Sequence, residues 1–288
     1  MYCMNPTLLQ RVLKIVIVSF ILAMILPDNN CYAQMNPRSV FVGVTFIKVR
    51  PGKQDQYQQL IEKYGKKINE YFYKKENLLG WYLYKILMPS GASVDYDYAA
   101  VNVVTSLSDL LDPPGSQKDL LKKVFPEMND KMIADMMAKY DSARIVIRRE
   151  VYTPVEGAQT GDTSNPVPAK YMEVDMMHPT AGKIDDYIKL EKETVKPLHA
   201  ERIKSGYLRN WGLYEKAFAD ERSGFEFVTV NFYDNLDKVG GGYEDAMKKV
   251  MPQTNINTLI TQILASRTMI RSEIWKLLYY VDRSNTKK

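Results

Sequence analysis

The sequence predicts an α+β protein built from two tandem copies of one unit, each ordered strand–helix–strand–strand–helix–strand. Three observations predict this: an internal repeat, alternating strand-like and helix-like hydrophobic patterns, and a linker-like segment between the copies. The chain has 288 residues, of which 45% are hydrophobic and 25% are charged. This is ordinary globular composition and enough chain for two domains.

The repeat appears as matching motifs at a nearly constant offset. Gly52-Lys53 matches Gly182-Lys183 at the start of a helical pattern, and Trp81-x-Leu83-Tyr84 matches Trp211-x-Leu213-Tyr214. The register then continues through three further matched pairs, which are Asn102 and Asn231, Arg148 and Arg271, and Glu150 and Glu273. Chance similarity does not hold register along the whole of two segments, so a tandem duplication is the prediction.

Each element of the first copy follows from its local pattern. Residues 39–49 alternate and are rich in β-branched and aromatic residues, which is typical of a strand. Residues 52–76 carry apolar residues at helical spacing after Pro51, a good first-turn residue. The remaining elements are two strands joined by a Pro/Ser/Gly turn, a second helix and a last strand, at 78–88, 96–105, 116–140 and 144–152. The second copy repeats them at 171–178, 182–205, 207–218, 225–233, 243–265 and 268–280.

This order is the ferredoxin-like split βαβ arrangement, in which both helices cover one face of a four-stranded antiparallel sheet. We expect the two open sheet faces to pack face to face as a pseudo-dimeric α/β barrel. The predicted divisions are a signal peptide at 1–33, repeats at 39–153 and 170–281, a Pro/Gly-rich linker at 154–169 and a tail at 282–288.

The paired Gly-Lys helix starts, Trp-x-Leu-Tyr strands and Arg-x-Glu last strands make the chain resemble the dimeric α/β-barrel superfamily, with both halves fused. The resemblance covers residues 39–281 and implies the fold. Members of the superfamily include cofactor-free monooxygenases, haem-degrading enzymes, haem-dependent peroxidases and stress-response proteins. A fold of this kind does not by itself imply one activity.

The N-terminal segment predicts export. Arg11 and Lys14 precede an apolar run, Ile15–Leu26, and Ala33 closes a site suited to signal-peptide cleavage. An uncleaved anchor, or a lipoprotein acylated at Cys31, are the alternatives. We expect a periplasmic or secreted protein, with no membrane attachment after cleavage.

Cysteine and charge exclude several classes of function. Cys3 and Cys31 both lie in the expected signal peptide, so a cleaved chain has no disulfide, catalytic thiolate or Cys-bound metal. The net charge of +5 is dispersed and does not favour nucleic acid as a partner. The sequence predicts a monomeric pseudo-dimer and leaves further association open.

Strand alternation selects the candidate site residues. We expect one phase of the strands to face the shared interior between the sheets and the uniformly apolar phase to meet the helices. This places Tyr152 and a set of polar and aromatic residues inside, namely Asn102, Arg148, Glu150, Glu173, Asp175, Asn231, Arg271, Glu273 and Trp275.

Charges on an enclosed face need pairing or hydration. Arg148–Glu150 and Arg271–Glu273 are interpreted either as salt bridges across the seam between the repeats or as the wall of a polar ligand pocket; a hydrated face is the third possibility. Glu173 and Asp175 occur only in the second copy and suit acid–base chemistry or a hard cation with Asn231. Neither role is fixed by spacing, so we predict no metal and no cofactor.

The positions of the histidine and tryptophan residues bear on the third possible function, haem binding. His178 is expected at the surface and His199 in solvent or satisfied in a partly buried position, while Trp81 and Trp211 are expected in the repeat cores. The resemblance implies an iron-ligating His on the second helix for haem chemistry, and neither His falls there.

Three functions therefore stay open. The favoured one is an exported small-molecule-binding or interaction protein with a polar pocket between the repeats. The alternatives are a cofactor-independent monooxygenase acting on an aromatic compound, and a haem-binding protein.

Overall fold

The structure of the chain is a computed structural model that describes residues 40–75, 78–91, 94–112, 116–159, 167–218 and 224–282. The expected signal peptide, and residues 160–166 and 283–288 of the expected linker and tail, lie outside the described residues. No described helix is both long and apolar enough to cross a membrane.

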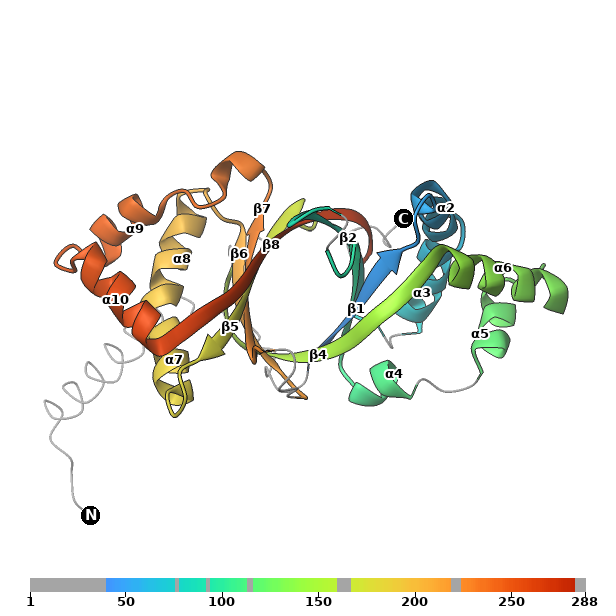
Figure 1. The fold of residues 1–288 in the computed structure, drawn as a ribbon, viewed down its shortest axis with the longest axis horizontal. Coiled ribbons are helices and arrows are strands. Elements are labelled where there is room, and N and C mark those ends of the chain that lie inside the picture. Colours follow the sequence, from blue (N-terminus) through green and yellow to red (C-terminus); the bar gives the residue numbers. More distant parts are fainter. Residues whose placement is uncertain are drawn as a thin grey trace, which may run out of the picture. The chain divides into compact units, whose positions relative to one another are not determined.

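Eight antiparallel strands form one closed barrel within the described residues (Figure 1). They are β1 (Phe41–Val49), β2 (Gly80–Met88), β3 (Tyr98–Val104), β4 (Arg144–Gln159), β5 (Tyr171–Pro179), β6 (Asn210–Lys216), β7 (Phe227–Tyr233) and β8 (Arg267–Val281). Their order around the barrel is β1-β3-β2-β8-β5-β7-β6-β4. Each repeat thus contributes four adjacent strands, and the β2–β8 and β4–β6 pairs join the repeats edge to edge.

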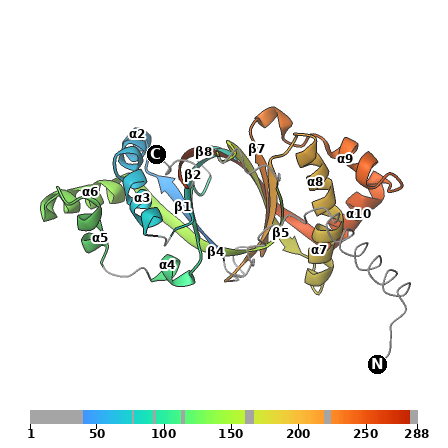
Figure 2. The ribbon, with the colours of Figure 1, turned by 180° about the vertical axis from the view of Figure 1, so that it is seen from behind.

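The helices of the two repeats cover opposite outer sides of the barrel (Figures 1 and 2). Those of the first repeat are α2 (Gln54–Leu60), η2 (Ile61–Gly65), α3 (Lys66–Lys74), α4 (Leu107–Leu111), α5 (Gln117–Val124) and α6 (Asp130–Ala143). Those of the second are α7 (Ile184–Leu190), η3 (Glu191–Val195), α8 (Lys196–Lys204), η5 (Leu236–Lys238), α9 (Tyr243–Val250) and α10 (Ile256–Ser266). The predicted α+β fold with two ferredoxin-like repeats is confirmed.

Two predicted helices are each divided in the structure. The segment expected at 116–140 is α5 followed by α6, and the segment expected at 243–265 is α9 followed by α10. Pro126 and Pro252 stand in the two breaks. Proline cannot donate the backbone hydrogen bond that a continuous helix requires there.

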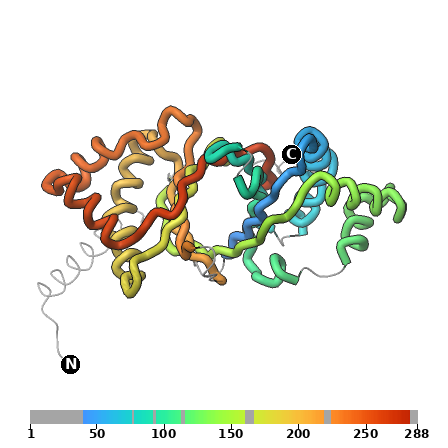
Figure 3. Tube along the Cα trace, viewed as in Figure 1, coloured from blue at the N-terminus to red at the C-terminus, as the bar shows by residue number. Residues whose placement is uncertain are grey.

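The last strand of each repeat is longer than expected because it serves two sheets. β4 pairs with β1 up to Tyr152 and with β6 from Tyr152 to Gln159, so the first part of the expected linker is strand. β8 likewise pairs first with β5 and then with β2. Figure 3 shows both segments running from the helices of their own repeat across to the other repeat.

Both faces of the barrel wall are therefore covered, and hydrophobic cores lie on both. The inner core contains Val44, Phe46, Val174, Val230 and Trp275. Outer cores lie beneath the helices of each repeat, around Leu83 and Tyr98 in the first and around Leu213 and Phe227 in the second. Because both faces of the first and third strands of each repeat are largely buried, apolar residues alone cannot identify the inner face of these strands.

Candidate functional site

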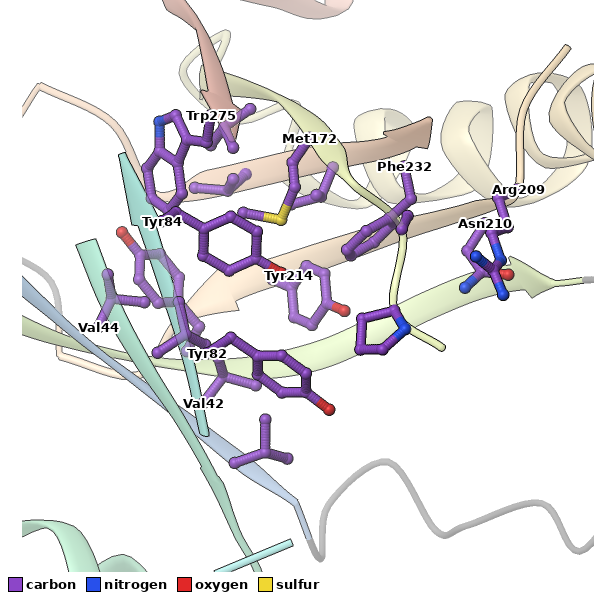
Figure 4. Close-up of a pocket in the computed structure, with 18 of the residues that line it drawn as sticks. Val42, Val44, Tyr82, Tyr84, Met172, Arg209, Asn210, Tyr214, Phe232 and Trp275 are labelled. Atoms are coloured by element: carbon purple, nitrogen blue, oxygen red, sulfur yellow. The ribbon is translucent and has the colours of Figure 1, made fainter. Parts of the chain in front are cut away.

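A cavity of about 540 Å³ lies inside the barrel, between the two repeats. Valine and methionine side chains from the first and third strands of each repeat form much of its wall, including Val44, Val101, Met172 and Val230. Figure 4 shows aromatic side chains from both repeats extending across it. Such a size and lining are typical of small-molecule sites.

Three tyrosines supply polar atoms to this mostly apolar wall. Tyr82 donates a hydrogen bond to Asp282 at 3.3 Å. The hydroxyls of Tyr84 and Tyr214 make no hydrogen bond within the described part of the chain. Burial raises the pKa of both phenols, so they stay protonated at neutral pH and remain available as donors.

A cluster of charges borders the cavity wall in the first repeat. Tyr152, which lines the cavity, donates a short hydrogen bond to Glu150. Arg148 Nε lies 3.1 Å from Glu150 Oε1, and Lys216 Nζ, from β6 of the second repeat, lies 3.2 Å from the same oxygen. Burial and the neighbouring Glu150 raise the pKa of Tyr152 well above its usual value, so it is the donor.

The second repeat provides the matching cluster around Glu273, which is fully buried. Its carboxylate accepts hydrogen bonds of 2.6 Å from Tyr96 Oη and Trp275 Nε1. Arg271 Nε lies 2.6 Å from Glu273 Oε1. Since Tyr96 belongs to the first repeat and Lys216 to the second, each carboxylate ties the two repeats together.

The predicted salt bridges therefore exist, but each one lies along its own strand. Arg148 pairs with Glu150, and Arg271 with Glu273, two residues apart. The contacts between the repeats come from Lys216 and Tyr96, and from Arg271, whose Nη1 lies 3.6 Å from Asp95 Oδ2 of the first repeat. These four charged residues and Trp275 face the barrel interior as expected, opposite Val44, Phe46, Val174, Met176 and Met172 in the strand register.

The expected orientation is wrong for the other four candidates. Asn102, Glu173, Asp175 and Asn231 face the helices, while the uniformly apolar phase lines the cavity. The error arises because a layer of buried polar side chains fills the space beneath the helices of the second repeat. Glu173 is hydrogen-bonded there, whereas one oxygen each of Asp175 and Asn231 is buried without a hydrogen-bond partner among the described residues. Polar side chains can be buried there because the helices bring their own hydrogen-bonding groups.

That polar layer begins at Glu173, which accepts hydrogen bonds from Asn231 at 3.1 Å and Tyr233 at 3.0 Å. Fully buried Arg202 donates to the Tyr233 hydroxyl at 3.2 Å and to the backbone oxygen of Gly241 at 2.9 Å. Its guanidinium carbon lies 3.8 Å from the Tyr243 ring centroid. The layer is a structural network rather than part of the barrel cavity.

Two further carboxyls lie in this layer. Burial raises the pKa of Asp175 to about 6. Burial also raises the pKa of Glu191, although Arg267 Nη1 lies 3.3 Å from its Oε1 and opposes the shift. Both side chains are costly to ionise, which makes the second repeat sensitive to pH.

Haem does not fit the histidines of the described residues. The His199 ring is buried, stacked on Trp211 at 5.2 Å and met edge-on by Tyr243, and its Nδ1 lies 3.1 Å from Arg202 Nη1. Burial and the nearby arginines lower the pKa of His199 to about 3. His178 is exposed and contacts Glu226 at 2.8 Å, as predicted for a surface residue. Neither ring faces the barrel cavity, so neither is placed to hold haem iron there.

Trp81 and Trp211 are buried in the outer cores, as predicted for core residues. Among the described residues, no group of three or more His, Cys, Asp or Glu side chains is placed to hold a metal ion.

Sequence reasoning missed the cavity tyrosines, although a signal was present. Tyr84 and Tyr214 end the repeated Trp-x-Leu-Tyr motif. The Trp and Leu of this motif are buried beneath the helices, so alternation directs the following Tyr to the inner face. Lys216 had no such signal, because the first repeat has Ile86 at the equivalent position.

No protein-family model matches the chain, and no curated protein matches it. Solved structures do resemble it. A candidate monooxygenase from Fusobacterium nucleatum has a TM-score of 0.52 at 12% identity, covering 85% of this chain and 95% of that chain. An anthrone oxidase-like protein has a TM-score of 0.45 at 12% identity, covering 84% and 92%. A haem-binding protein from Thermus thermophilus has a TM-score of 0.43 at 11% identity, with the same coverage.

At these identities the likeness concerns the fold and not the activity. The closed barrel of two ferredoxin-like repeats, together with the match to the Fusobacterium structure over most of both chains, shows that this protein has the dimeric α/β-barrel fold.

Proposed function

We propose that this protein is an exported small-molecule-binding protein whose barrel cavity takes a mainly apolar, aromatic compound carrying a hydrogen-bond acceptor. The proposal rests on the cavity of about 540 Å³, whose largely apolar wall includes Tyr84 and Tyr214. The hydroxyls of these two residues have no hydrogen-bond partner in the part of the chain that the structure describes. Apolar walls supply most of the binding free energy, and a few placed polar groups fix the orientation.

The chemistry of the wall narrows the ligand class. Both phenols are protonated donors, so the ligand must offer an acceptor such as a carbonyl or quinone oxygen. Two charged residues line the cavity, and both have partners: Arg209 Nη1 lies 3.0 Å from Asp234 Oδ1, and Asp282 accepts a hydrogen bond from Tyr82. The carboxylates of Glu150 and Glu273, next to the cavity, are likewise paired with cations and donors. A neutral ligand therefore suits the cavity better than a charged one.

Isothermal titration calorimetry with 1,4-naphthoquinone tests this proposal, with naphthalene as the matched ligand that lacks carbonyl oxygens. We expect naphthoquinone to bind more tightly than naphthalene. Tyr84→Phe and Tyr214→Phe should each weaken naphthoquinone binding by about 1 kcal/mol, the usual contribution of one hydrogen bond. Tyr64→Phe, which removes a hydroxyl outside the cavity, is the control.

A cavity-filling variant gives the decisive outcome. Val101→Trp places a large ring in the cavity and should abolish binding of both ligands. Binding that survives this change, or that is equal for naphthoquinone and naphthalene, would contradict the proposed site or its polar recognition.

A second candidate function is cofactor-independent oxygenation of such an aromatic compound. It is favoured by the hydrogen bond from Tyr152, in the cavity wall, to Glu150, which places a carboxylate next to a phenol of the cavity. Oxygen uptake with anthrone or a naphthoquinol is the test. Uptake above the buffer rate that falls in Glu150→Gln supports it, and no uptake rules it out for these substrates.

Export is tested separately. If the segment before Gln34 is a cleaved signal peptide, protein recovered from outside the cytoplasm should begin at Gln34 on N-terminal sequencing. Recovery of the full-length chain from the cytoplasm would contradict export.

A further inference from the structure

A second cavity, of about 280 Å³, lies beneath the helices of the first repeat. It is separate from the barrel cavity, since the two share no lining residue. Its walls are largely apolar and include Ile61, Leu83, Leu121 and Met136. Gln117 and Asp141 also line it and are exposed, so the cavity reaches solvent at α5 and α6.

One cation faces this cavity without a carboxylate partner. The guanidinium carbon of Arg144 lies 5.1 Å from the Tyr140 ring centroid and 6.0 Å from that of Tyr57. Of the acidic residues that the structure describes, none lies within ion-pair distance of Arg144. The Tyr57 hydroxyl next to it is buried and has no hydrogen-bond partner.

The second repeat shows what such an arginine requires. Its equivalent, Arg267, packs on Tyr187 in the same way, with 5.6 Å between the guanidinium carbon and the ring centroid. There, Glu191 from the π-helical turn η3 places a carboxylate 3.3 Å from the guanidinium. The first repeat has Ile61 at the position of Glu191, so Arg144 has no equivalent of the carboxylate that pairs with Arg267.

Two neighbouring differences leave the space open. The second repeat has Val195 and His199 where the first has Gly65 and Asn69, which are smaller residues. Gly65 and Asn69 both line the first-repeat cavity. The same backbone frame therefore encloses an ion pair in the second repeat. In the first repeat it encloses a cavity and a cation that has no carboxylate partner among the described residues.

We propose that this cavity is a binding site for a small monocarboxylic acid with an apolar body. The ligand carboxylate takes the position that the Glu191 side chain holds in the second repeat, accepting from Arg144 and from the Tyr57 hydroxyl. The apolar body lies against Ile61, Leu83 and Trp81. Asp141 at the opening disfavours ligands with a second negative charge.

Benzoate is the probe, and calorimetry or ligand-observed NMR on the full chain is the measurement. Benzamide has the same shape without the charge, and phthalate adds a second carboxylate. We expect benzoate to bind at least about tenfold more tightly than either, because a charge-assisted contact contributes more than a neutral one.

Two substitutions locate the binding. Ile61→Glu installs the partner that the second repeat already accommodates and should abolish benzoate binding, whereas Ile61→Gln, of equal length without charge, should retain it. Arg144→Gln should weaken binding by about tenfold or more. Val101→Trp, which fills the barrel cavity, should leave benzoate binding unchanged.

Circular dichroism establishes that each variant is folded. If Arg144→Gln does not fold, Arg144→Lys replaces it and should weaken benzoate binding by a smaller factor. The proposal is overturned if benzoate does not bind, if benzamide binds equally well, or if Ile61→Glu binds like the wild type. It is also overturned if Val101→Trp abolishes benzoate binding, because the ligand then occupies the barrel cavity.

Discussion

The two repeats share one backbone frame but bury different chemistry beneath their helices. In the first repeat the space between sheet and helices holds apolar side chains, a cavity and Arg144, which has no carboxylate partner among the described residues. In the second it holds Glu173, Asp175, Glu191 and Arg202 as a continuous polar layer. A duplicated unit can thus keep its strand register while its two cores diverge. The backbone arrangement depends on strand pairing and turns, whereas a core requires only that its own side chains pack against one another.

The inner face of the barrel diverges less. Arg148 with Glu150 and Arg271 with Glu273 are retained in both repeats, and each carboxylate also binds a group from the other repeat. Residues that hold the two repeats together are therefore duplicated, and residues buried within one repeat are free to differ.

The largest expected effect comes from Arg202, whose equivalent in the first repeat is Phe72. Arg202→Met removes the donor to Tyr233 and Gly241 and leaves their acceptors unpaired. We expect the free energy of unfolding to fall by about 3 kcal/mol or more, typical of breaking a buried charged network. Phe72→Met, at a half-buried position, should cost less than about 1.5 kcal/mol. Equal losses in urea unfolding would remove the distinction between the repeats.

Asp175 is expected to make the second repeat pH-sensitive, unlike Thr45 at the same position in the first. Burial raises the pKa of Asp175 from 3.8 to about 6 in the folded protein. The folded state therefore binds the proton more tightly than the unfolded state. Below about pH 4 Asp175 is protonated in both the folded and the unfolded state, and its burial does not lower the free energy of unfolding. As the pH rises, ionisation of Asp175 lowers the free energy of unfolding. This loss is complete above about pH 6, where it reaches about 3 kcal/mol.

Asp175→Asn keeps the shape without the charge. It should raise the unfolding free energy at pH 7 and flatten the loss of stability between about pH 4 and pH 6. Thr45→Ser in the first repeat is the control and should leave this pH profile unchanged. A wild-type stability that rises over this interval would show that Asp175 is not the dominant group.

Tyr96 tests the interior contacts between repeats, since Phe225 takes its place in the second copy. Tyr96→Phe removes the 2.6 Å hydrogen bond to the buried Glu273. Arg271 still neutralises that carboxylate and Trp275 still donates a hydrogen bond to it, so we expect a loss of about 1.5 kcal/mol in chemical unfolding. Tyr98→Phe removes only an outer-face hydroxyl and should cost less; the reverse order would contradict the role of Tyr96.

The smallest effects are expected where both repeats carry a surface pair at the same place. Lys48 contacts Asp97 at 3.1 Å in the first repeat, and His178 contacts Glu226 at 2.8 Å in the second. Lys48→Met and His178→Ala should each change the unfolding free energy by less than about 1 kcal/mol, because solvent screens such pairs. A larger loss for one of them would reveal a further asymmetry between the repeats.

Much of this architecture was predictable from the sequence because it depends on local signals. The repeated Gly-Lys and Trp-x-Leu-Tyr motifs indicated the duplication, and alternating strands with two helices indicated the ferredoxin-like unit. Arg148, Glu150, Arg271 and Glu273 were placed correctly in the interior. Their positions followed from the repeat, in which the same charged residues recur on one face of the last strand of each copy.

The sequence alone therefore determined the duplicated α+β fold and one charged strip of its interior. Only the tertiary structure decided which face of the first and third strands lines the cavity, and so placed Glu173, Asp175 and Asn231 beneath the helices. The physical reason is that both strand faces are buried in a closed barrel, so polarity no longer distinguishes inside from outside. Whether a buried polar group is satisfied depends on partners such as Arg202 and Arg267, which come from distant parts of the chain and meet it only after folding.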